Sequence, residues 1–218
     1  MKTYVIFGVS VVVLIIAFVA GSSYYKGKQS EKFGFMAQEN AEIFVRNHSQ
    51  TLGSDDAKVY LIEFMDPACE TCAAFSSFVK QMIVTNPGKI KLVLRYAPFH
   101  DGSDYFVKIL EAAKKQGKYW ETLNVMYKSQ PYWASHSNPQ PQRIWQFLPQ
   151  AGVDVERIRR DMNDPAIAKL IDQDLADAKM LNVRKTPGYF VNGKPLQTFG
   201  SNQLLQLVQS EINANYPN

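Results

Sequence analysis

The chain has 218 residues, of which 46% are hydrophobic and 12% aromatic, so it can bury one substantial core. Its net charge of +4 is modest, and its basic residues are interspersed with acidic ones rather than massed. This distribution argues against a nucleic-acid-binding protein.

The first 25 residues differ in kind from the rest of the chain. The segment Thr3–Tyr25 carries no charge, and Tyr4–Ala20 is almost continuously apolar. About 20 apolar residues span a membrane as a helix, whereas a secretory signal usually carries about 7–15. We therefore expect residues 1–25 to be a membrane anchor, inserted through residues 4–23, with a cleaved signal sequence as the alternative. Lysines on both sides of the run leave its orientation open.

Residues 26–57 are predicted to form a connector between this segment and the folded core. A short helix is expected around residues 37–47. The run Gly-Ser-Asp-Asp at residues 53–56 predicts a turn just before the first strand.

A strand, a helix and a second strand are predicted next. Residues 58–65 form an apolar run that suits a strand buried on both faces. After Cys69, apolar residues recur at helical spacing and predict a helix of about 14 residues that ends near Asn86. Apolar and polar residues then alternate over residues 90–96, which is a strand period. Short connections make residues 58–100 a right-handed βαβ unit.

The pattern from residue 103 to about residue 183 is helical, so residues 101–183 are predicted to be an inserted helical block. Interruptions are expected at Pro131, residues 139–141, Gly152 and residues 164–165. Residues 184–218 then form a ββα half. Its strand, hairpin turn, second strand and helix are predicted at residues 188–191, 192–193, 194–199 and 202–215.

The central signal is a pair of cysteines spaced Cys69-Glu70-Thr71-Cys72 between a predicted strand and a predicted helix. The free amide groups and the dipole at a helix N-terminus stabilise a thiolate on Cys69. Cys72 lies one turn further in, within reach of a disulfide and more deeply buried. A reactive thiolate with a resolving thiol behind it is what thiol–disulfide exchange requires.

Other uses of a cysteine pair are less well supported. A structural zinc site needs about four ligands, and His48, His100 and His136 show no ligand spacing. Attachment of a c-type haem needs a histidine where Ala73 stands. We therefore predict a redox pair without metal or cofactor. A zinc site and an inert structural disulfide remain as alternatives.

Two motifs carry a resemblance to a known family. They are residues 64–72 (Phe-Met-Asp-Pro-Ala-Cys-Glu-Thr-Cys) and residues 185–193 (Lys-Thr-Pro-Gly-Tyr-Phe-Val-Asn-Gly). Together with the helical block between them, they resemble the DsbA-like branch of the thioredoxin superfamily, over about residues 52–216. The resemblance implies an α/β thioredoxin fold with an inserted helical domain, and thiol:disulfide oxidoreductase activity.

The resemblance also implies roles for three residues. Pro187 matches a cis-proline that faces the cysteine pair and turns the backbone of Thr186 toward it, where an extended substrate chain can pair. Glu63 matches a buried acid near the second cysteine. Such a carboxyl has a raised pKa and can take the proton of Cys72. A structural pairing of Glu63 with Lys58 is the alternative.

The dipeptide between the cysteines is expected to tune the pair. Strong oxidants of this branch often carry histidine there, whereas this chain has Glu70 and Thr71. A negative charge at Glu70 would raise the thiolate pKa and make the disulfide a weaker oxidant. A threonine before the cis-proline, here Thr186, is more similar to the isomerase-like members of this branch than to its strongest oxidants. His100 follows the second strand and either lies near the cleft or is solvated.

Disulfide chemistry of this kind persists outside the reducing cytosol. We therefore predict an extracytoplasmic enzyme that exchanges disulfides with unfolded or folding proteins, reset by a membrane redox partner. An isomerase or reductase of the same fold remains open. A non-catalytic chaperone or metal-binding module is the alternative from another class.

Overall fold

In the computed structural model, residues 2–39, 41–135 and 139–217 are described. Within them, five strands form one sheet: β1 (Gln50–Gly53), β2 (Val59–Met65), β3 (Ile90–Tyr96), β4 (Gly188–Val191) and β5 (Lys194–Pro195). The helices are α1 (Lys2–Glu39), α2 (Glu70–Thr85), α3 (Asp104–Lys114), α4 (Tyr119–Trp133), α5 (Val155–Asp161), α6 (Pro165–Met180) and α7 (Ser201–Asn215). Short 3-10 helices are η1 (Ala41–Ile43), η2 (Pro141–Gln146) and η3 (Leu148–Ala151).

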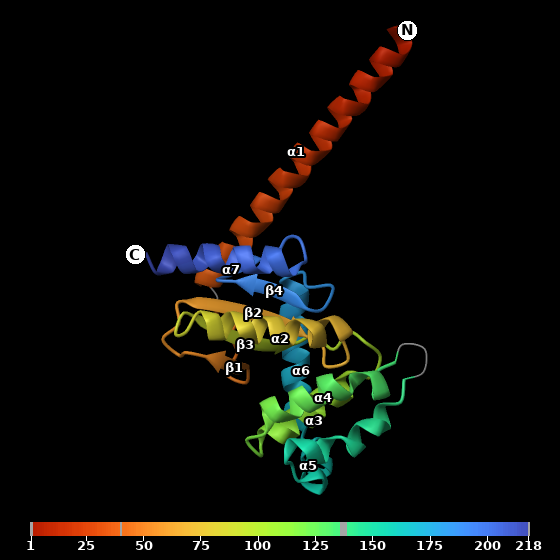
Figure 1. Cartoon of the computed structure of the whole chain (residues 1–218), viewed down its shortest axis with the longest axis vertical. Coiled ribbons are helices and arrows are strands. Elements are labelled where there is room, and N and C mark those ends of the chain that lie inside the picture. The colour runs from red at the N-terminus through yellow and green to blue at the C-terminus, as the bar shows by residue number, and fades with distance from the viewer. Residues whose placement is uncertain (1, 40, 136–138, 218) are drawn as a thin grey trace.

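The strand order is β1-β3-β2-β4-β5 (Figure 1). Strands β2 and β3 run parallel and are joined by α2, and the other neighbouring pairs are antiparallel. This arrangement confirms the predicted βαβ unit and the ββα end. As predicted, β2 is buried on both faces, apart from the half-buried Tyr60. The strand that leads to the cysteines therefore lies at the centre of the sheet.

Different helices cover the two faces of the sheet (Figure 1). Leu61 and Met65 of β2 belong to the core that includes α2 and α7, whereas Ile62 and Phe64 pack in a second cluster with α6. Side chains alternate along a strand, so Glu63 shares the face of Leu61 and Met65. The sheet therefore presents Glu63 to the helix that carries the cysteines.

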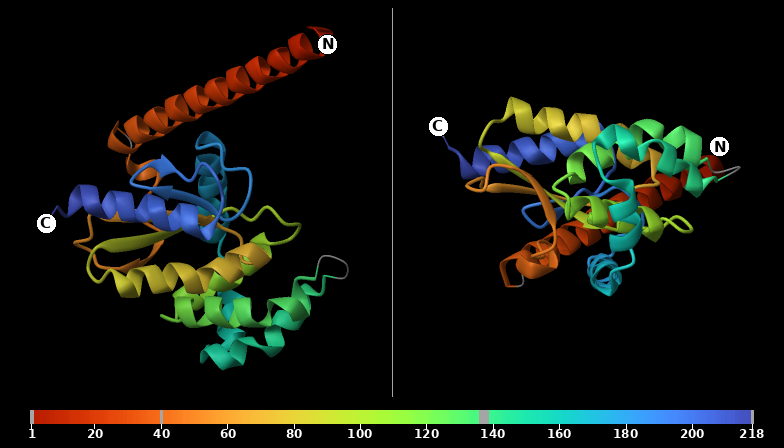
Figure 2. Two further views of the ribbon diagram at one scale, coloured as in Figure 1. Left: turned by 45° about the horizontal axis from the view of Figure 1, so that its top comes forward. Right: turned by 90° about the horizontal axis from the view of Figure 1, so that it is seen from below.

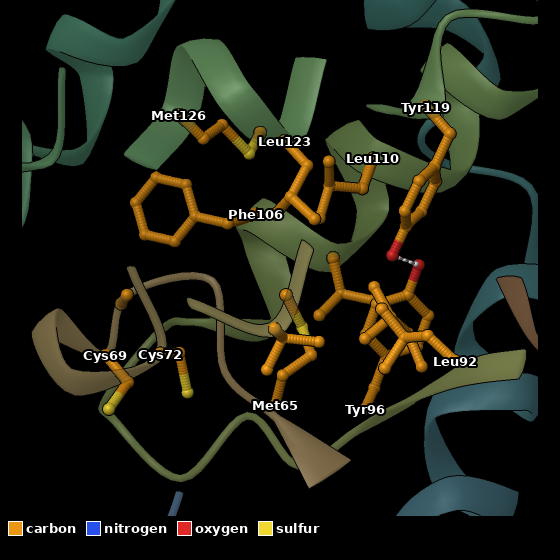
Figure 3. Close-up of a cluster of buried hydrophobic side chains, with 14 of the residues drawn as sticks. Met65, Cys69, Cys72, Leu92, Tyr96, Phe106, Leu110, Tyr119, Leu123 and Met126 are labelled. Atoms are coloured by element: carbon orange, nitrogen blue, oxygen red, sulfur yellow. Dashed lines mark hydrogen bonds between the residues drawn. The ribbon is translucent and has the colours of Figure 1, made fainter. Parts of the chain in front are cut away.

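The region from α3 to α6 is helical, as its periodicity predicted. Phe106 of α3, with Leu123 and Met126 of α4, belongs to the same buried core as Cys69 and Cys72 (Figure 3). One predicted interruption is wrong, because α4 continues through Pro131. The helix ends at Trp133, two residues after the proline. The helical block thus forms one wall of the region around the cysteine pair.

The N-terminal quarter differs from the prediction. Helix α1 projects from the domain (Figures 1 and 2) and runs unbroken from Lys2 to Glu39. The short helix expected around residues 37–47 is instead the end of α1 followed by η1. Strand β1 was not predicted, because four residues show too few alternations to reveal a strand. It is held at the sheet edge by antiparallel pairing with β3.

Within the described parts of the chain, no helix is both long and apolar enough to cross a membrane. The membrane-spanning helix predicted for residues 4–23 is therefore not supported by the structure. That prediction was based on the length of the apolar run, whereas the helix that forms continues past it into a polar and charged second half.

The C-terminal hairpin follows its predicted turn. Asn192 and Gly193 both have positive φ angles, of 47° and 80°, as a tight two-residue turn requires. The second strand is shorter than residues 194–199, because pairing with β4 covers only Lys194 and Pro195. One further backbone hydrogen bond follows, from the Leu196 amide to the carbonyl of Tyr189 at 2.9 Å. The residues after Pro195 instead form a loop beside the cysteine pair.

Candidate active site

The two cysteines lie at the start of α2, directly after β2. Cys69 is the N-cap residue of α2, and Cys72 lies in its first turn. Both are free thiols, and Cys72 is completely buried while Cys69 retains 6% exposure. The Cys69 amide donates to the carbonyl of Asp66 at 3.0 Å, which closes the turn between strand and helix. The predicted placement of the pair is therefore observed.

The surroundings of Cys69 stabilise its thiolate. A hydrogen bond from the Cys72 thiol is the largest cause, and it lowers the pKa of Cys69 to about 5. Burial opposes this effect, while Thr186 and the backbone amides of Cys72 and Thr71 add to it. These amides belong to the free N-terminus of the helix. Cys69 is therefore ionised at neutral pH.

The surroundings of Cys72 have the opposite effect. Burial raises its pKa well above the usual value for a thiol, and the Cys69 thiolate and the Glu63 carboxyl raise it further. Cys72 therefore keeps its proton at neutral pH. The two sulfur atoms are close neighbours in sequence and space, but they differ strongly in acidity.

Glu63 is buried beneath the pair with 4% exposure. Burial raises its pKa to about 8, while Tyr189 and Lys80 lower it. Lys80 and Tyr127 line a small cavity together with Glu63. The alternative partner Lys58 lies elsewhere, because its Nζ atom is 3.4 Å from the carbonyl oxygen of Asn215.

The loop before β4 approaches the pair from the other side. The Thr186–Pro187 peptide bond is cis, as the resemblance implied. The Cys69 Sγ atom lies 3.3 Å from the carbonyl oxygen of Thr186. The structure therefore brings together Cys69, Cys72 and Thr186, three of the predicted site residues.

A cavity of about 510 Å³ lies next to this loop. Thr71, which lies between the two cysteines in sequence, and Thr186 both line it. Its other lining residues are mostly apolar, with two cations: Val183, Arg184, Lys185, Pro187, Tyr189, Leu196, Gln197 and Phe199. A cavity of this size accommodates several side chains of an extended peptide.

The predicted tuning residues differ in their surroundings. Glu70 is exposed in the first turn of α2, and it is not among the largest contributions to the pKa of Cys69. Its effect on the redox pair stays a prediction. Thr71 contributes its backbone amide to the Cys69 thiolate and lines the adjacent cavity.

Several contacts around the active-site turn were not predicted from the sequence, apart from a position of His100 near the cleft. The carboxylate of Asp66 is fully buried and accepts from Ala68 N at 2.8 Å and from both the backbone amide and Nδ1 of His100, at 3.0 and 2.7 Å. His100 therefore lies beside the active-site turn. From α4, Gln130 donates to the carbonyl of Pro67 at 3.0 Å. The only signal for these contacts was the Asp-Pro pair that precedes Cys69.

His48 does not join the site. The Nε2 atom of His48 lies 2.7 Å from Asp174, in a buried ion-pair network with Arg95. His136 lies outside the described residues. Within the described part of the chain, His48 supplies no ligand next to the cysteine pair.

The chain is similar to known proteins in both sequence and structure. The family model described as Thioredoxin matches residues 46–210, which is most of the chain. The chain belongs to the thioredoxin family. Among solved structures, this thioredoxin-family chain is similar to a thioredoxin-like oxidoreductase from Silicibacter pomeroyi DSS-3, with a TM-score of 0.67 and 25% identity. That match covers 78% of this chain and 96% of the other.

Two further relatives are matched over very different fractions of their own length. The chain is 29% identical over 162 residues to a probable disulfide bond formation protein D from Bacillus cereus, covering 70% of this chain and 74% of that protein. It is 28% identical over 145 residues to a Na⁺/H⁺ antiporter NhaA from Herminiimonas arsenicoxydans, covering 66% of this chain. The match spans only 22% of that antiporter's length.

The structural likeness extends to more distant members. BdbD from Bacillus subtilis matches with a TM-score of 0.65 and 21% identity, over 76% of this chain and 93% of the other. At this level of identity the likeness shows the shared fold. The thioredoxin fold predicted from the two motifs is thus confirmed.

Proposed function

We propose that this protein is a thiol:disulfide oxidoreductase that exchanges disulfides with protein substrates through Cys69 and Cys72. The observation that carries this proposal is the difference in acidity between the two sulfurs. Cys69 is a thiolate at neutral pH, whereas Cys72 is a buried thiol. An ionised nucleophile and a protonated resolving thiol are the two parts that exchange requires.

The proposed reaction has two steps. The Cys69 thiolate attacks one sulfur of a substrate disulfide, and the other substrate sulfur leaves as a thiolate. Cys72 then transfers its proton to the Glu63 carboxylate and attacks Cys69, which forms the Cys69–Cys72 disulfide and releases the second substrate thiolate. Two electrons pass from the enzyme to the substrate. Oxidation of a substrate dithiol runs through the same steps in reverse, with Glu63 returning the proton to Cys72.

Thr186 and Pro187 are proposed to bind the substrate backbone. The Thr186 carbonyl lies at the Cys69 sulfur, where an extended chain that carries the reacting cysteine would pass. The apolar cavity beside Thr186 provides room for the neighbouring side chains. We propose unfolded or folding proteins as substrates, because such chains present extended segments.

The low pKa of Cys69 supports net oxidation of substrates. A stabilised thiolate makes the reduced form more stable and the disulfide more oxidising. We propose an extracytoplasmic location, where such disulfides persist, and a redox partner that restores the disulfide. Isomerase or reductase activity uses the same residues, and the reduction potential of the pair separates these roles.

The test is substrate trapping with two matched variants. Cys72→Ser should accumulate mixed disulfides with unfolded proteins, because the resolving thiol is missing. Cys69→Ser should form none, and it should abolish catalysed reduction of insulin. Equal trapping by both variants, or insulin reduction by Cys69→Ser, would contradict the assignment of Cys69 as nucleophile. Absence of exchange in the wild type would favour a non-catalytic binding module.

A further inference from the structure

Tyr189 of β4 lies next to Glu63 across the sheet. In the antiparallel register of β2 and β4, Glu63 and Tyr189 are direct partners. Side chains of such partners share one face of a sheet and lie within about 4.5–5.5 Å at their Cβ atoms. Both residues are buried, with 4% and 3% exposure. The Tyr189 side chain therefore lies in the same apolar layer as the Glu63 carboxyl.

The hydroxyl of Tyr189 has an unusual environment. Among the described residues it is a buried hydroxyl with no partner that meets hydrogen-bond geometry. Buried tyrosine hydroxyls usually have a partner, because leaving one unpaired is costly. It nevertheless lies close enough to Glu63 to lower the pKa of that carboxyl. The two groups are thus near neighbours that have not closed a full hydrogen bond.

The state of Glu63 explains this loose contact. With a pKa of about 8, the carboxyl is protonated and neutral at pH 7. A neutral carboxyl has little need of a donor, whereas an ionised carboxylate in an apolar layer needs one. Glu63 can accept the Cys72 proton only after it has ionised, so the carboxylate is the species that needs to be stabilised.

We propose that Tyr189 is a positioning residue for proton transfer between Cys72 and Glu63, through a hydrogen bond that its hydroxyl donates to the Glu63 carboxylate. This inference rests on the proposed role of Glu63. Tyr189 keeps its own proton, because burial raises its pKa well above the usual value. The proton that Cys72 loses is held by Glu63, and Tyr189 makes the ionised form of Glu63 accessible near neutral pH.

Other titratable groups also face Glu63. They are Lys80 and the two cysteines on α2, and Tyr119 and Tyr127 on α4. Lys80 acts as a half-buried cation at the end of the cavity, and it lowers the pKa of Glu63 by charge alone. Tyr189 is distinguished from the two tyrosines of α4 by its strand pairing with Glu63.

The experiment follows the two thiol reactions separately. Reduced protein is mixed with excess 5,5′-dithiobis(2-nitrobenzoate), and release of the coloured thiolate is recorded by stopped flow between pH 5.5 and 10. The first phase is attack by Cys69, and the second is displacement by Cys72. The variants are Tyr189→Phe, Glu63→Gln and their combination. Tyr105→Phe in α3 serves as a control for loss of a tyrosine hydroxyl.

We expect Tyr189→Phe to shift the pH profile of the second phase upward by about one pH unit and to slow that phase about tenfold at pH 7. The first phase should keep its profile, and Tyr105→Phe should change neither phase. Adding Tyr189→Phe to Glu63→Gln should produce no further change, because the two residues act as one unit. A merely structural Tyr189 would not move the pH profile.

The outcomes separate this inference from the proposed function. One outcome is that Glu63→Gln slows the second phase and removes its pH dependence while the pH profile of Tyr189→Phe matches that of the wild type. That result would overturn the role of Tyr189 and leave the proposed role of Glu63 intact. If Glu63→Gln also leaves the second phase unchanged, the proposed role of Glu63 fails first. Tyr189→Phe removes one oxygen that lacks a partner and keeps the ring contact with Phe75, so thermal melting should show a folded protein.

Discussion

Replacing Glu63 by glutamine removes a carboxyl that the fold keeps protonated. Burial raises the pKa of Glu63 from the ordinary 4.5 to about 8. Between these values the unfolded chain has lost the proton and the folded chain holds it. The contribution of Glu63 to the stability of the wild type therefore falls as pH rises from about 4.5 to about 8.

The magnitude follows from the difference in pKa. At about 1.36 kcal/mol per pKa unit, the rise to about 8 corresponds to an upper limit of about 5 kcal/mol above pH 8. Local relaxation and water penetration reduce such penalties, so we expect about 2–5 kcal/mol. Glutamine is neutral at every pH and has nearly the same shape. Glu63→Gln should therefore be more stable than wild type at pH 9 and close to wild type at pH 4.5.

The assay is urea unfolding of the reduced proteins at pH 4.5, 7 and 9. The variant should gain free energy of unfolding steadily over this range, relative to wild type. Glu156→Gln is the matched control, because the Glu156 side chain is 75% exposed and should show no such trend. An equal difference at all three pH values, or a variant less stable than wild type at pH 9, would refute the reasoning.

Three further outcomes are expected. Iodoacetamide should alkylate Cys69 far faster than Cys72 in the reduced protein, with a midpoint near pH 5; equal rates would reverse the assignment of nucleophile and resolving thiol. Glu70→His should make the pair more oxidising by tens of millivolts in a glutathione redox titration. If the reduction potential of the variant is unchanged or less oxidising, the predicted effect of the Glu70 charge is wrong. Replacing both Arg184 and Lys185 by glutamine should slow reduction of acidic peptide disulfides a few-fold at low salt, and an equal effect on basic peptides would show that charge is not selected.

Local sequence patterns determined most of the scaffold. The apolar run before Cys69 specified a central strand, and the helical spacing after it specified α2. The Asn192–Gly193 pair specified the hairpin turn, because both residues accept positive φ. These features depend on neighbours within a few residues. The cysteine spacing and the motif around Pro187 likewise carried the family resemblance.

Elements that depend on distant partners could not be predicted from local sequence patterns. Strand β1 exists because the edge of β3 offers it free backbone groups, and β5 contributes only Lys194 and Pro195 to the register with β4. The buried charge network of Arg95 with Asp174 joins residues 79 positions apart. No local pattern reports such pairings, since their energy comes from groups that meet only after folding.

By itself, the sequence predicted which two sulfur atoms react and indicated on which kind of element they lie. Only the tertiary structure decided their acidities. The thiolate of Cys69 depends on hydrogen bonds from Cys72 and Thr186, and the proton of Cys72 depends on complete burial beside Glu63. Strand register placed the Tyr189 hydroxyl next to that carboxyl. Acidity is a property of the local dielectric and of nearby donors, and both are created by packing segments that lie more than a hundred residues apart.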